Sequence, residues 1–331
     1  MNKRILITGG AGFIGLHLAN HLLDHGYSIL LVDNYSRGVN DSELNKTLKK
    51  DRITFVNCDL RDKKKVLQLG NDLYAIFHLA AIVGVAHVSK EPNRVLSDNV
   101  QTLGNVIELG HMQHDFARLL FASTSEVYAG TLETIGMNIP TPESTLLALP
   151  DLNRPRTSYM LSKIYGEAMC HHSNLPFTVF RPHNVYGPRM GMSHVIPQQL
   201  KKAHFLNDGQ SIEIFSPGHT RCFCYVDDAV QMMREIMESE ICQGKTLNLG
   251  VESPELSIKE VASECYRVVG KNLVFDYKNE TEGSPARRSP DMRQMGLLVG
   301  NSQPIGITEG IDRTYAWYKT NVFEANTVSA I

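Results

Sequence analysis

A glycine-rich turn near the start of the chain constrains the fold more than any other feature of the sequence. The apolar run Arg4–Thr8 leads directly into Gly9-Gly10-Ala11-Gly12-Phe13-Ile14-Gly15, and leucines at helical spacing follow it. A strand, a glycine turn and a helix in this order let the backbone approach a pyrophosphate, which the amide groups at the helix start can bind. We therefore expect a dinucleotide-binding fold, in which the phosphates are contacted by Gly9, Gly12, Phe13, Ile14 and Gly15.

Further strand-like runs alternate with helical stretches through the first half of the chain. They lie at residues 28–32, 53–57, 75–79, 119–122 and 177–181. Short β-branched runs separated by helices are typical of a parallel sheet with helices on both faces. We expect an α/β fold with a doubly wound, Rossmann-type parallel sheet over residues 1–185, to which elements near 225–250 return. Residues 186–320, which several prolines interrupt, are expected to form a smaller, interleaved C-terminal substrate-binding lobe, followed by a loosely held tail beyond about Asn321.

The composition excludes several classes of partner. The 331 residues carry a formal net charge of -2, which gives no electrostatic reason to expect nucleic acid or an acidic membrane. No apolar run approaches the roughly 20 residues that span a bilayer, and the N-terminus enters a strand directly. We expect a cytoplasmic protein. Cys222 and Cys224 lack a second Cys/His pair at zinc spacing, so no metal site is predicted.

Asp33 and Asn34 follow the second strand-like run. Asp33 comes 18 residues after Gly15. A carboxylate at this place can accept both hydroxyls of an adenosine ribose, and it repels the 2′-phosphate that distinguishes NADP from NAD. Arg37 argues the other way, because an arginine can accommodate that phosphate. The alternative interpretation of Asp33 is a simple turn residue. We expect NAD as the cofactor, with Asp33 and Asn34 beside it.

A tyrosine and a lysine stand four residues apart in the segment Tyr159-Met160-Leu161-Ser162-Lys163. On a helix this spacing places both side chains on one face. A free tyrosine, with a pKa of about 10, is a poor base at neutral pH, but a nearby ammonium and a cationic nicotinamide favour the phenolate. Tyr159 is therefore predicted to take a hydroxyl proton while hydride leaves the same carbon for the nicotinamide.

Polar side chains end the strand-like run at residues 119–122. Thr124, Ser125 and Glu126 follow it directly. Because ligands bind beyond the carboxyl ends of parallel strands, these three side chains are predicted to face the substrate. A helix cap or a polar cluster at the strand end is the structural alternative.

Other motifs occur in a fixed order along nearly the whole chain. They are Asp59-Leu60, His78-Leu79-Ala80-Ala81, Asn99, Arg181-Pro182-His183-Asn184-Val185-Tyr186-Gly187-Pro188, Thr220-Arg221-x-Phe223-x-Tyr225-Val226-Asp227-Asp228 and Arg288-x-Pro290-Asp291. With the glycine turn and the Tyr–Lys pair, they resemble the extended short-chain dehydrogenase/reductase family, specifically its nucleotide-sugar epimerases, dehydratases and decarboxylases.

The resemblance implies roles for individual residues. Asp59 and Leu60 would contact adenine, Ala80 and Asn99 would lie beside the cofactor, and Thr124 would bind the sugar O4. A nucleoside-diphosphate sugar is the implied substrate, oxidised transiently at C4, and a homodimer built through two helices per subunit is the implied assembly. The residues that would hold the phosphates or ribose of the substrate are Asn184, Arg221 and Arg288.

The reaction subclass stays open at this point. Glu126 is typical of the dehydratases and decarboxylases and favours chemistry at C5 or C6, whereas a 4-epimerase would use it only to orient the sugar. A net dehydrogenase and a catalytically silent NAD-binding regulator are further alternatives. Residues 129–153 are expected to form a loop over the site, and His183 either contacts the sugar or packs in the core.

Overall fold

A seven-stranded parallel sheet forms the larger part of the molecule. The computed structural model describes residues 3–272, 274–279, 285–300 and 303–325. The strand order is β11-β6-β5-β4-β1-β2-β3, and every neighbouring pair is parallel. This arrangement confirms the predicted doubly wound fold. The strands are β1 (Arg4–Thr8), β2 (Ser28–Asp33), β3 (Ile53–Asn57), β4 (Leu73–His78), β5 (Arg118–Ala122), β6 (Phe177–Pro182) and β11 (Thr246–Leu249).

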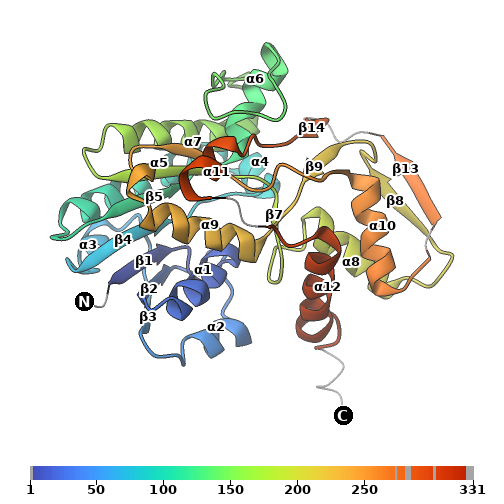
Figure 1. Cartoon of the computed structure of the whole chain (residues 1–331), viewed down its shortest axis with the longest axis horizontal. Helices are drawn as coiled ribbons and strands as arrows, with labels where there is room; N and C mark the ends of the chain where they lie inside the picture. The colour runs from blue at the N-terminus through green and yellow to red at the C-terminus, as the bar shows by residue number, and fades with distance from the viewer. Residues whose placement is uncertain (1–2, 273, 280–284, 301–302, 326–331) are drawn as a thin grey trace.

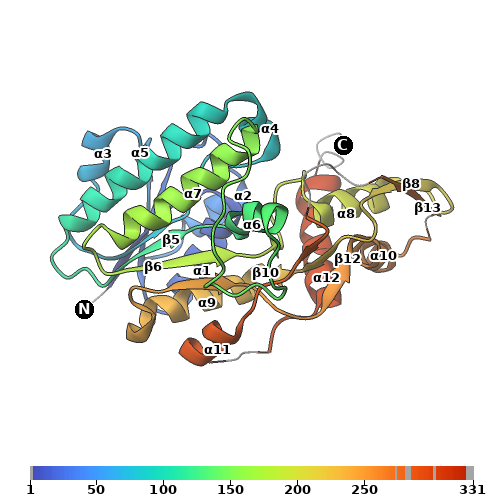
Figure 2. The ribbon, with the colours of Figure 1, turned by 90° about the horizontal axis from the view of Figure 1, so that it is seen from above.

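Helices cover both faces of this sheet, as Figures 1 and 2 show. Alternation along β1 explains why, since successive side chains point to opposite faces. Ile5 and Ile7 pack with α1 (Phe13–Asp24) and α9 (Val226–Glu238), and Leu6 packs on the other face. That second face is covered by α3 (Lys63–Leu67), α5 (Pro92–His111) and α7 (Pro155–His171).

A smaller group of elements lies to the right in Figure 1 and is called the small lobe below. Two parallel strands pair here, β8 (Ser211–Phe215) and β13 (Val274–Lys278), and three helices pack together. Ser257 and Glu260 form a reciprocal cap at the start of α10 (Ile258–Val269), and Gly270 ends this helix in the left-handed conformation. The three helices are α8 (Val195–Phe205), α10 (Ile258–Val269) and α12 (Ile307–Tyr318).

Short elements connect the small lobe to the large sheet. β7 (Val185–Tyr186) pairs with β10 (Cys224–Tyr225), and β9 (Thr220–Cys222) lies between β12 (Glu255–Ser257) and β14 (Arg287–Arg288). α11 (Arg293–Val299) returns to pack on β11 and α9. The remaining elements before the C-terminal turn are α2 (Ser42–Thr47), α4 (Val85–Lys90), α6 (Ala129–Thr134) and the 3-10 helices η1 (Ser125–Tyr128) and η2 (Glu240–Cys242).

The end of the described chain differs from its prediction. Lys319–Phe323 continues α12 as a π-helical turn, and the buried Phe323 ring stacks on Tyr318 with ring centroids 5.7 Å apart. The expected loose tail is therefore wrong up to Phe323, because this aromatic contact anchors it, and residues 326–331 lie outside the described residues. Among the helices that the structure describes, none is long and apolar enough to cross a bilayer.

Candidate active site

A cleft of about 1540 Å³ opens at the carboxyl ends of the central strands and continues between the sheet and the small lobe. The strand order reverses between the neighbouring strands β1 and β4. From β1 the chain continues to β2 and β3 on one side of the sheet, and from β4 it continues to β5 and β6 on the other side. Ligands of open α/β sheets bind at such a reversal. Every residue that the sequence predicts for cofactor, substrate or catalysis lines this cleft.

The glycine turn forms the floor of the cleft under the start of α1. Gly9 has a φ of +71°, which favours glycine, and a Cβ at Gly15 would collide with the carbonyl oxygen of Gly9. Gly12 is the N-cap of α1 and offers no side-chain acceptor, so the first amides of the helix are left for a ligand. Phe13 and Ile14 follow in this first turn, which is the arrangement that a pyrophosphate requires.

Asp33 connects the end of β2 to the glycine turn. Its side chain accepts hydrogen bonds from the backbone N–H of Ala11 at 3.1 Å and of Tyr35 at 2.8 Å. Each carboxylate oxygen keeps a second lone pair for a ribose hydroxyl. Gly38 leaves room for this carboxylate, because a Cβ there would lie 2.8 Å from its Oδ2. Asn34 follows on the same wall of the cleft.

Asp59 and Leu60 lie at the adenine end of the predicted cofactor path. The sequence gives no hint of the partner of Asp59, which is Arg61: its Nη2 donates to Oδ2 at 2.6 Å and its Nη1 donates to Asp98 at 3.0 Å. These hydrogen bonds lower the pKa of Asp59 to about 2. An adenine amino group would therefore share this carboxylate with Arg61.

Ala80 and Asn99 belong to the wall beside the glycine turn, since a Cβ on Gly9 would lie only 3.0 Å from the backbone N of Ala80. The Thr8 hydroxyl accepts from the N–H of Leu79 and of Ala80, so it donates its own hydrogen to His78 Nδ1. The Asn99 amide is hydrogen-bonded to the backbone of Ile82 and to the Ser162 hydroxyl. Asn99 thus ties this wall to α7.

Tyr159 and Thr124 form the centre of the site. The Tyr159 phenol is buried near the Thr124 hydroxyl, whose oxygen accepts from the N–H of Glu126. Burial raises the pKa of Tyr159, and the Glu126 charge raises it further, while the Thr124 hydroxyl and the Arg37 charge oppose both.

The Lys163 ammonium lies 5.9 Å from the centre of the Tyr159 ring and donates a hydrogen bond of 2.7 Å to the carbonyl of Ala122. Burial lowers the pKa of Lys163 to about 8. The sequence predicts an ammonium that lowers the pKa of Tyr159. In the structure, desolvation of the phenol is the largest influence on that pKa and raises it. The predicted lowering also depends on a cationic nicotinamide beside the phenol, and it stays a prediction.

Glu126 and two arginines define the sugar end of the cleft. Glu126 Oε1 lies 3.9 Å from Arg156 Nη2, and Arg288 Nη1 donates to the Ser125 hydroxyl at 3.4 Å. The Glu126 charge also favours the ionised form of Arg288, whose pKa burial lowers. Arg156 was not predicted as a site residue. It lies three residues before Tyr159 on α7, and this helical spacing places it at the cleft as well.

Asn184 and Arg221 line the wall that the short strands form. Asn184, with a φ of +40°, donates from Nδ2 to the Cys222 carbonyl at 3.0 Å. Arg221 donates to the carbonyls of Thr220 at 2.7 Å and Pro285 at 2.5 Å, and burial lowers its pKa to about 10. Both side chains therefore line the cleft and also stabilise this wall through hydrogen bonds to its backbone carbonyls.

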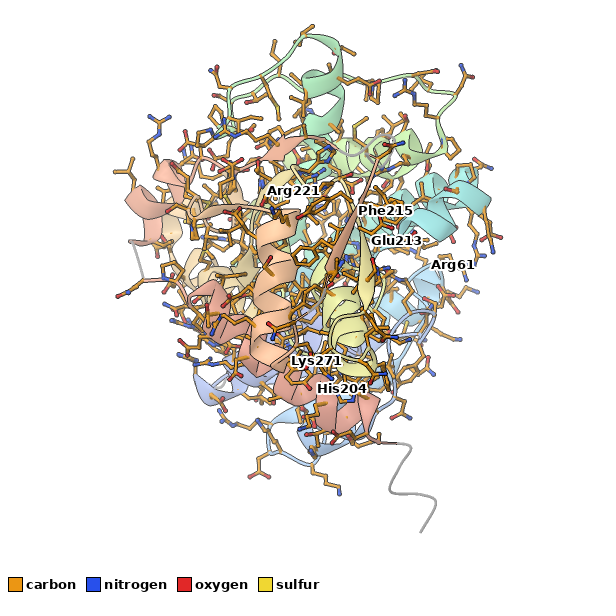
Figure 3. The ribbon with its side chains drawn as sticks, turned by 90° about the vertical axis from the view of Figure 1, so that its right-hand side faces the viewer. Arg61, His204, Glu213, Phe215, Arg221 and Lys271 are labelled. Atoms are coloured by element: carbon orange, nitrogen blue, oxygen red, sulfur yellow. The ribbon has the colours of Figure 1, made fainter. Side chains whose placement is uncertain are left out.

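Phe215 is a cleft residue that the motifs do not reveal. It is 53% exposed, and Ile212 and Ile214 are buried, so Glu213 and Phe215 occupy the side of β8 away from α10. Figure 3 shows these two side chains on β8 and Arg221 on the same side of the molecule. Polar or exposed residues alternate with isoleucines in Ser211–Phe215, so the sequence could have indicated a strand with one buried face. It could not show that the other face meets the cleft, because that depends on the fold.

Residues 129–153 do not line the large cleft within the part of the chain that the structure describes. They begin as α6 and fold back on themselves, since Thr131 accepts from the N–H of Ala148 at 2.9 Å. The segment nevertheless lies next to the substrate end of the site, since Ala129, Leu132, Met137 and Thr141 line a small cavity together with Ser125 and Arg288. A role in covering the site stays a prediction. His183 is buried, and its Nε2 lies 3.2 Å from Asn248 Oδ1, so it packs in the core beside the same small cavity. Among the described residues, no group of three metal-ligating side chains occurs.

The fold and the site define a class of protein: a Rossmann-type enzyme with a Tyr–Lys pair beside a dinucleotide cradle. NAD fits this cradle, because the glycine turn leaves amides for phosphates and Asp33 leaves acceptors for a ribose. Residues 5–250 match the model of the NAD dependent epimerase/dehydratase family. The chain belongs to that family, and the prediction of an NAD-dependent enzyme that modifies a nucleotide sugar is confirmed.

Known proteins resemble the chain over almost its whole length. A UDP-N-acetyl-alpha-D-glucosaminuronate decarboxylase from Bacillus cytotoxicus is 30% identical, over 96% of this chain and 98% of its own. UDP-glucuronic acid decarboxylase 1 from Xenopus tropicalis is 32% identical, over 96% of this chain and 72% of its own. Among solved structures, a UDP-glucuronic acid 4-epimerase from Bacillus cereus, in complex with UDP-glucuronic acid and NAD, is 25% identical with a TM-score of 0.78, over 96% and 99% of the two chains.

Proposed function

We propose that this enzyme decarboxylates the uronic acid of a UDP-linked sugar, after oxidising it at C4. The observation that carries the proposal is the cluster at the sugar end of the cleft, where Glu126 lies among Tyr159, Arg156 and Arg288. Arg288 makes one hydrogen bond in the described structure, to Ser125, so its guanidinium keeps donors for a sugar carboxylate. The likeness of the chain to the two decarboxylases described above supports this choice.

The residues divide the chemistry between them. Bound NAD supplies a nicotinamide that can accept hydride from C4 of the sugar. Thr124 holds the sugar O4 against the Tyr159 oxygen, which takes the O4 proton in its phenolate form. Lys163 fixes the end of β5 through Ala122 and adds positive charge near the phenol. The cofactor is held by the glycine turn, Asp33, Asn34, Asp59, Leu60, Ala80 and Asn99.

Arg288 and Arg156 orient the carboxylate at C6. Once C4 is a ketone, that carboxylate is β to it, and the C5–C6 bond can break with its electron pair passing to the ketone oxygen. Carbon dioxide leaves, and C5 then takes a proton. Return of the hydride to C4 and of the Tyr159 proton to O4 completes the UDP-pentose, so no external oxidant or reductant is needed. Glu126 is the acid/base group beside these carbons. Asn184, Arg221 and the exposed Phe215 ring form the wall for the phosphates, ribose and base of the nucleotide.

Product analysis tests the proposal. The enzyme is incubated with NAD and, separately, with UDP-glucuronic acid, UDP-N-acetylglucosaminuronic acid and UDP-glucose, and the products are identified by NMR. We expect one of the two uronic acids to yield a UDP-pentose and carbon dioxide, and UDP-glucose to remain unchanged. A six-carbon product inverted at C4 would contradict decarboxylation and establish the alternative, a 4-epimerase acting on a uronic acid, which the likeness to the Bacillus cereus epimerase favours.

The organisation of the molecule is part of the proposal. We propose that residues 1–185, with the returning elements near 225–250, bind NAD, and that residues 186–320 form the substrate lobe. We also propose a cytoplasmic homodimer built through α5 and α7, which lie side by side on one face in Figure 2 and expose 54% of Tyr165. Light scattering of the purified protein tests the dimer, and a monomeric mass would contradict it.

A further inference from the structure

The segment from Gly187 to Met192 crosses from the large sheet to the small lobe, between β7 and α8. Arg189 lies in the middle of it with a φ of +67°, a conformation that is uncommon for a residue other than glycine. Its side chain is 6% exposed. A long cation buried in a strained position indicates that its contacts hold it there.

All the contacts of Arg189 reach back to the cofactor-binding side of the cleft. Nη1 donates to the carbonyl of Gly12 at 3.1 Å, and Nη2 donates to those of Ala11 at 3.3 Å and Val39 at 3.2 Å. Nε donates to Asp41 Oδ2 at 2.8 Å. One guanidinium therefore binds the glycine turn and the loop that follows Asp33 at the same time.

These contacts fix the orientation of two peptide groups in the glycine turn. The C=O and N–H of a trans peptide point in opposite directions, so holding one directs the other. The Ala11–Gly12 peptide is held at both ends, by Arg189 and by the hydrogen bond of 3.1 Å from the Gly12 N–H to Gly9. The Gly12–Phe13 peptide is held at its carbonyl, which directs the Phe13 N–H to the opposite side.

The same segment is anchored in the rest of the molecule at its two neighbouring carbonyls. His17 of α1 lies 3.1 Å from the Pro188 carbonyl through Nε2, and the Tyr318 hydroxyl of α12 donates to the Met190 carbonyl. The position of Arg189 is thus set by α1 on one side and by the small lobe on the other.

We infer that Arg189 is a positioning residue for the cofactor: from the small-lobe side of the cleft it holds the glycine turn in the conformation that binds the pyrophosphate. The inference concerns binding and is independent of the reaction that the enzyme catalyses. It predicts that the dependence on Arg189 appears only for ligands that carry the pyrophosphate.

The experiment measures ligand affinity in the wild type and in three variants. Titration calorimetry gives the Kd of NAD and of ADP-ribose, and ligand-observed NMR gives that of adenosine. Arg189→Met removes the charge and all donors, and Arg189→Lys keeps the charge with fewer donors. Arg118→Met is the matched control, because Arg118 is also buried and donates to two backbone carbonyls, those of Ile236 and Ser239, away from the cleft.

We expect Arg189→Met to raise the Kd of NAD and ADP-ribose at least tenfold while the Kd of adenosine and every affinity of Arg118→Met stay within twofold. Arg189→Lys should raise the Kd of ADP-ribose about threefold or more. The inference is overturned if NAD binds Arg189→Met as tightly as the wild type, or if adenosine loses as much affinity as ADP-ribose. If Arg189→Met does not fold, Arg189→Lys decides alone: a change in the Kd of ADP-ribose below twofold overturns the inference.

Discussion

Glu167 and Arg181 form a buried, two-point ion pair directly behind the active site. Arg181 Nε and Nη2 donate to the two carboxylate oxygens at 2.9 and 2.6 Å, and the side chains are 5% and 8% exposed for Arg181 and Glu167. Ser123 donates to the same carboxylate at 2.5 Å, and Arg181 also donates to the Tyr128 hydroxyl at 2.7 Å. The pair therefore fixes the segment 123–128, which carries Thr124 and Glu126, against α7.

Replacing Glu167 by alanine should destabilise the protein strongly. Arg181 would be left as a buried charge without its partner, which costs about 3–5 kcal/mol in comparable cases. Urea unfolding of Glu167→Ala should show a loss in the free energy of unfolding of that order. Glu133→Ala is the control, because the Glu133–Arg154 pair is about half exposed and should contribute less than about 1 kcal/mol. An equal loss in the free energy of unfolding in both variants would show that the buried ion pair contributes no more to stability than the exposed one.

Replacing Glu126 by glutamine should change both the rate and its pH dependence. If Glu126 is the acid/base group, turnover should fall by about two decades or more. The Glu126 charge raises the pKa of Tyr159, so its removal lowers that pKa. Tyr159 acts in its deprotonated form, so the rising limb of the pH profile of kcat/KM should move to lower pH. Near-normal turnover with an unmoved limb would rule against both roles of Glu126.

The sequence allowed the sheet and the catalytic centre to be predicted because both depend on local patterns. Apolar runs such as Ser28–Val32 mark strands by themselves, and the glycine turn lies at the end of one of them. Thr124 follows another strand, so the rule that ligands bind beyond strand ends located it. Tyr159 and Lys163 needed only the helical repeat.

What the sequence did not predict depends on contacts between distant segments. Arg61 and Arg189 look like ordinary charged residues. Their importance follows from Asp98 and from the glycine turn, which only the fold brings into contact with them. The burial that raises the pKa of Tyr159 is of the same kind: the neighbouring Lys163 is visible in the sequence, but the burial of the phenol is not. The fold of residues 129–153 back on Thr131 is likewise not visible in the sequence.

Replacing Asp33 by alanine should weaken NAD binding and reduce the discrimination against NADP. The variant loses the ribose acceptor and also the hydrogen bond that ties β2 to the Ala11 N–H. We expect the Kd of NAD to rise at least tenfold by titration calorimetry, and the ratio of the NADP to the NAD dissociation constant to fall. Unchanged NAD affinity would reject the assignment of Asp33 to the ribose.

Lys163 should make the stability of the protein depend on pH in the alkaline range. Burial lowers the pKa of Lys163 in the folded state to about 8, whereas an unfolded lysine titrates near 10.4. Below pH 8 both states are protonated and the folded state bears the full cost of the buried charge. Between about pH 8 and 10.4 the unfolded state binds more protons, so this residue's contribution to the free energy of unfolding rises with pH, by roughly 3 kcal/mol in all.

The comparison of the wild type with Lys163→Met isolates that contribution, because the other titrating groups occur in both proteins. The free energy of unfolding is measured in urea at pH 7, 8, 9 and 10. We expect the stability of the wild type relative to Lys163→Met to increase steadily from pH 8 to 10, since methionine fills the same space without a charge to bury. A difference that stays constant over this range would mean that Lys163 keeps an ordinary pKa in the folded protein, and that its ammonium remains fully charged beside Tyr159 throughout.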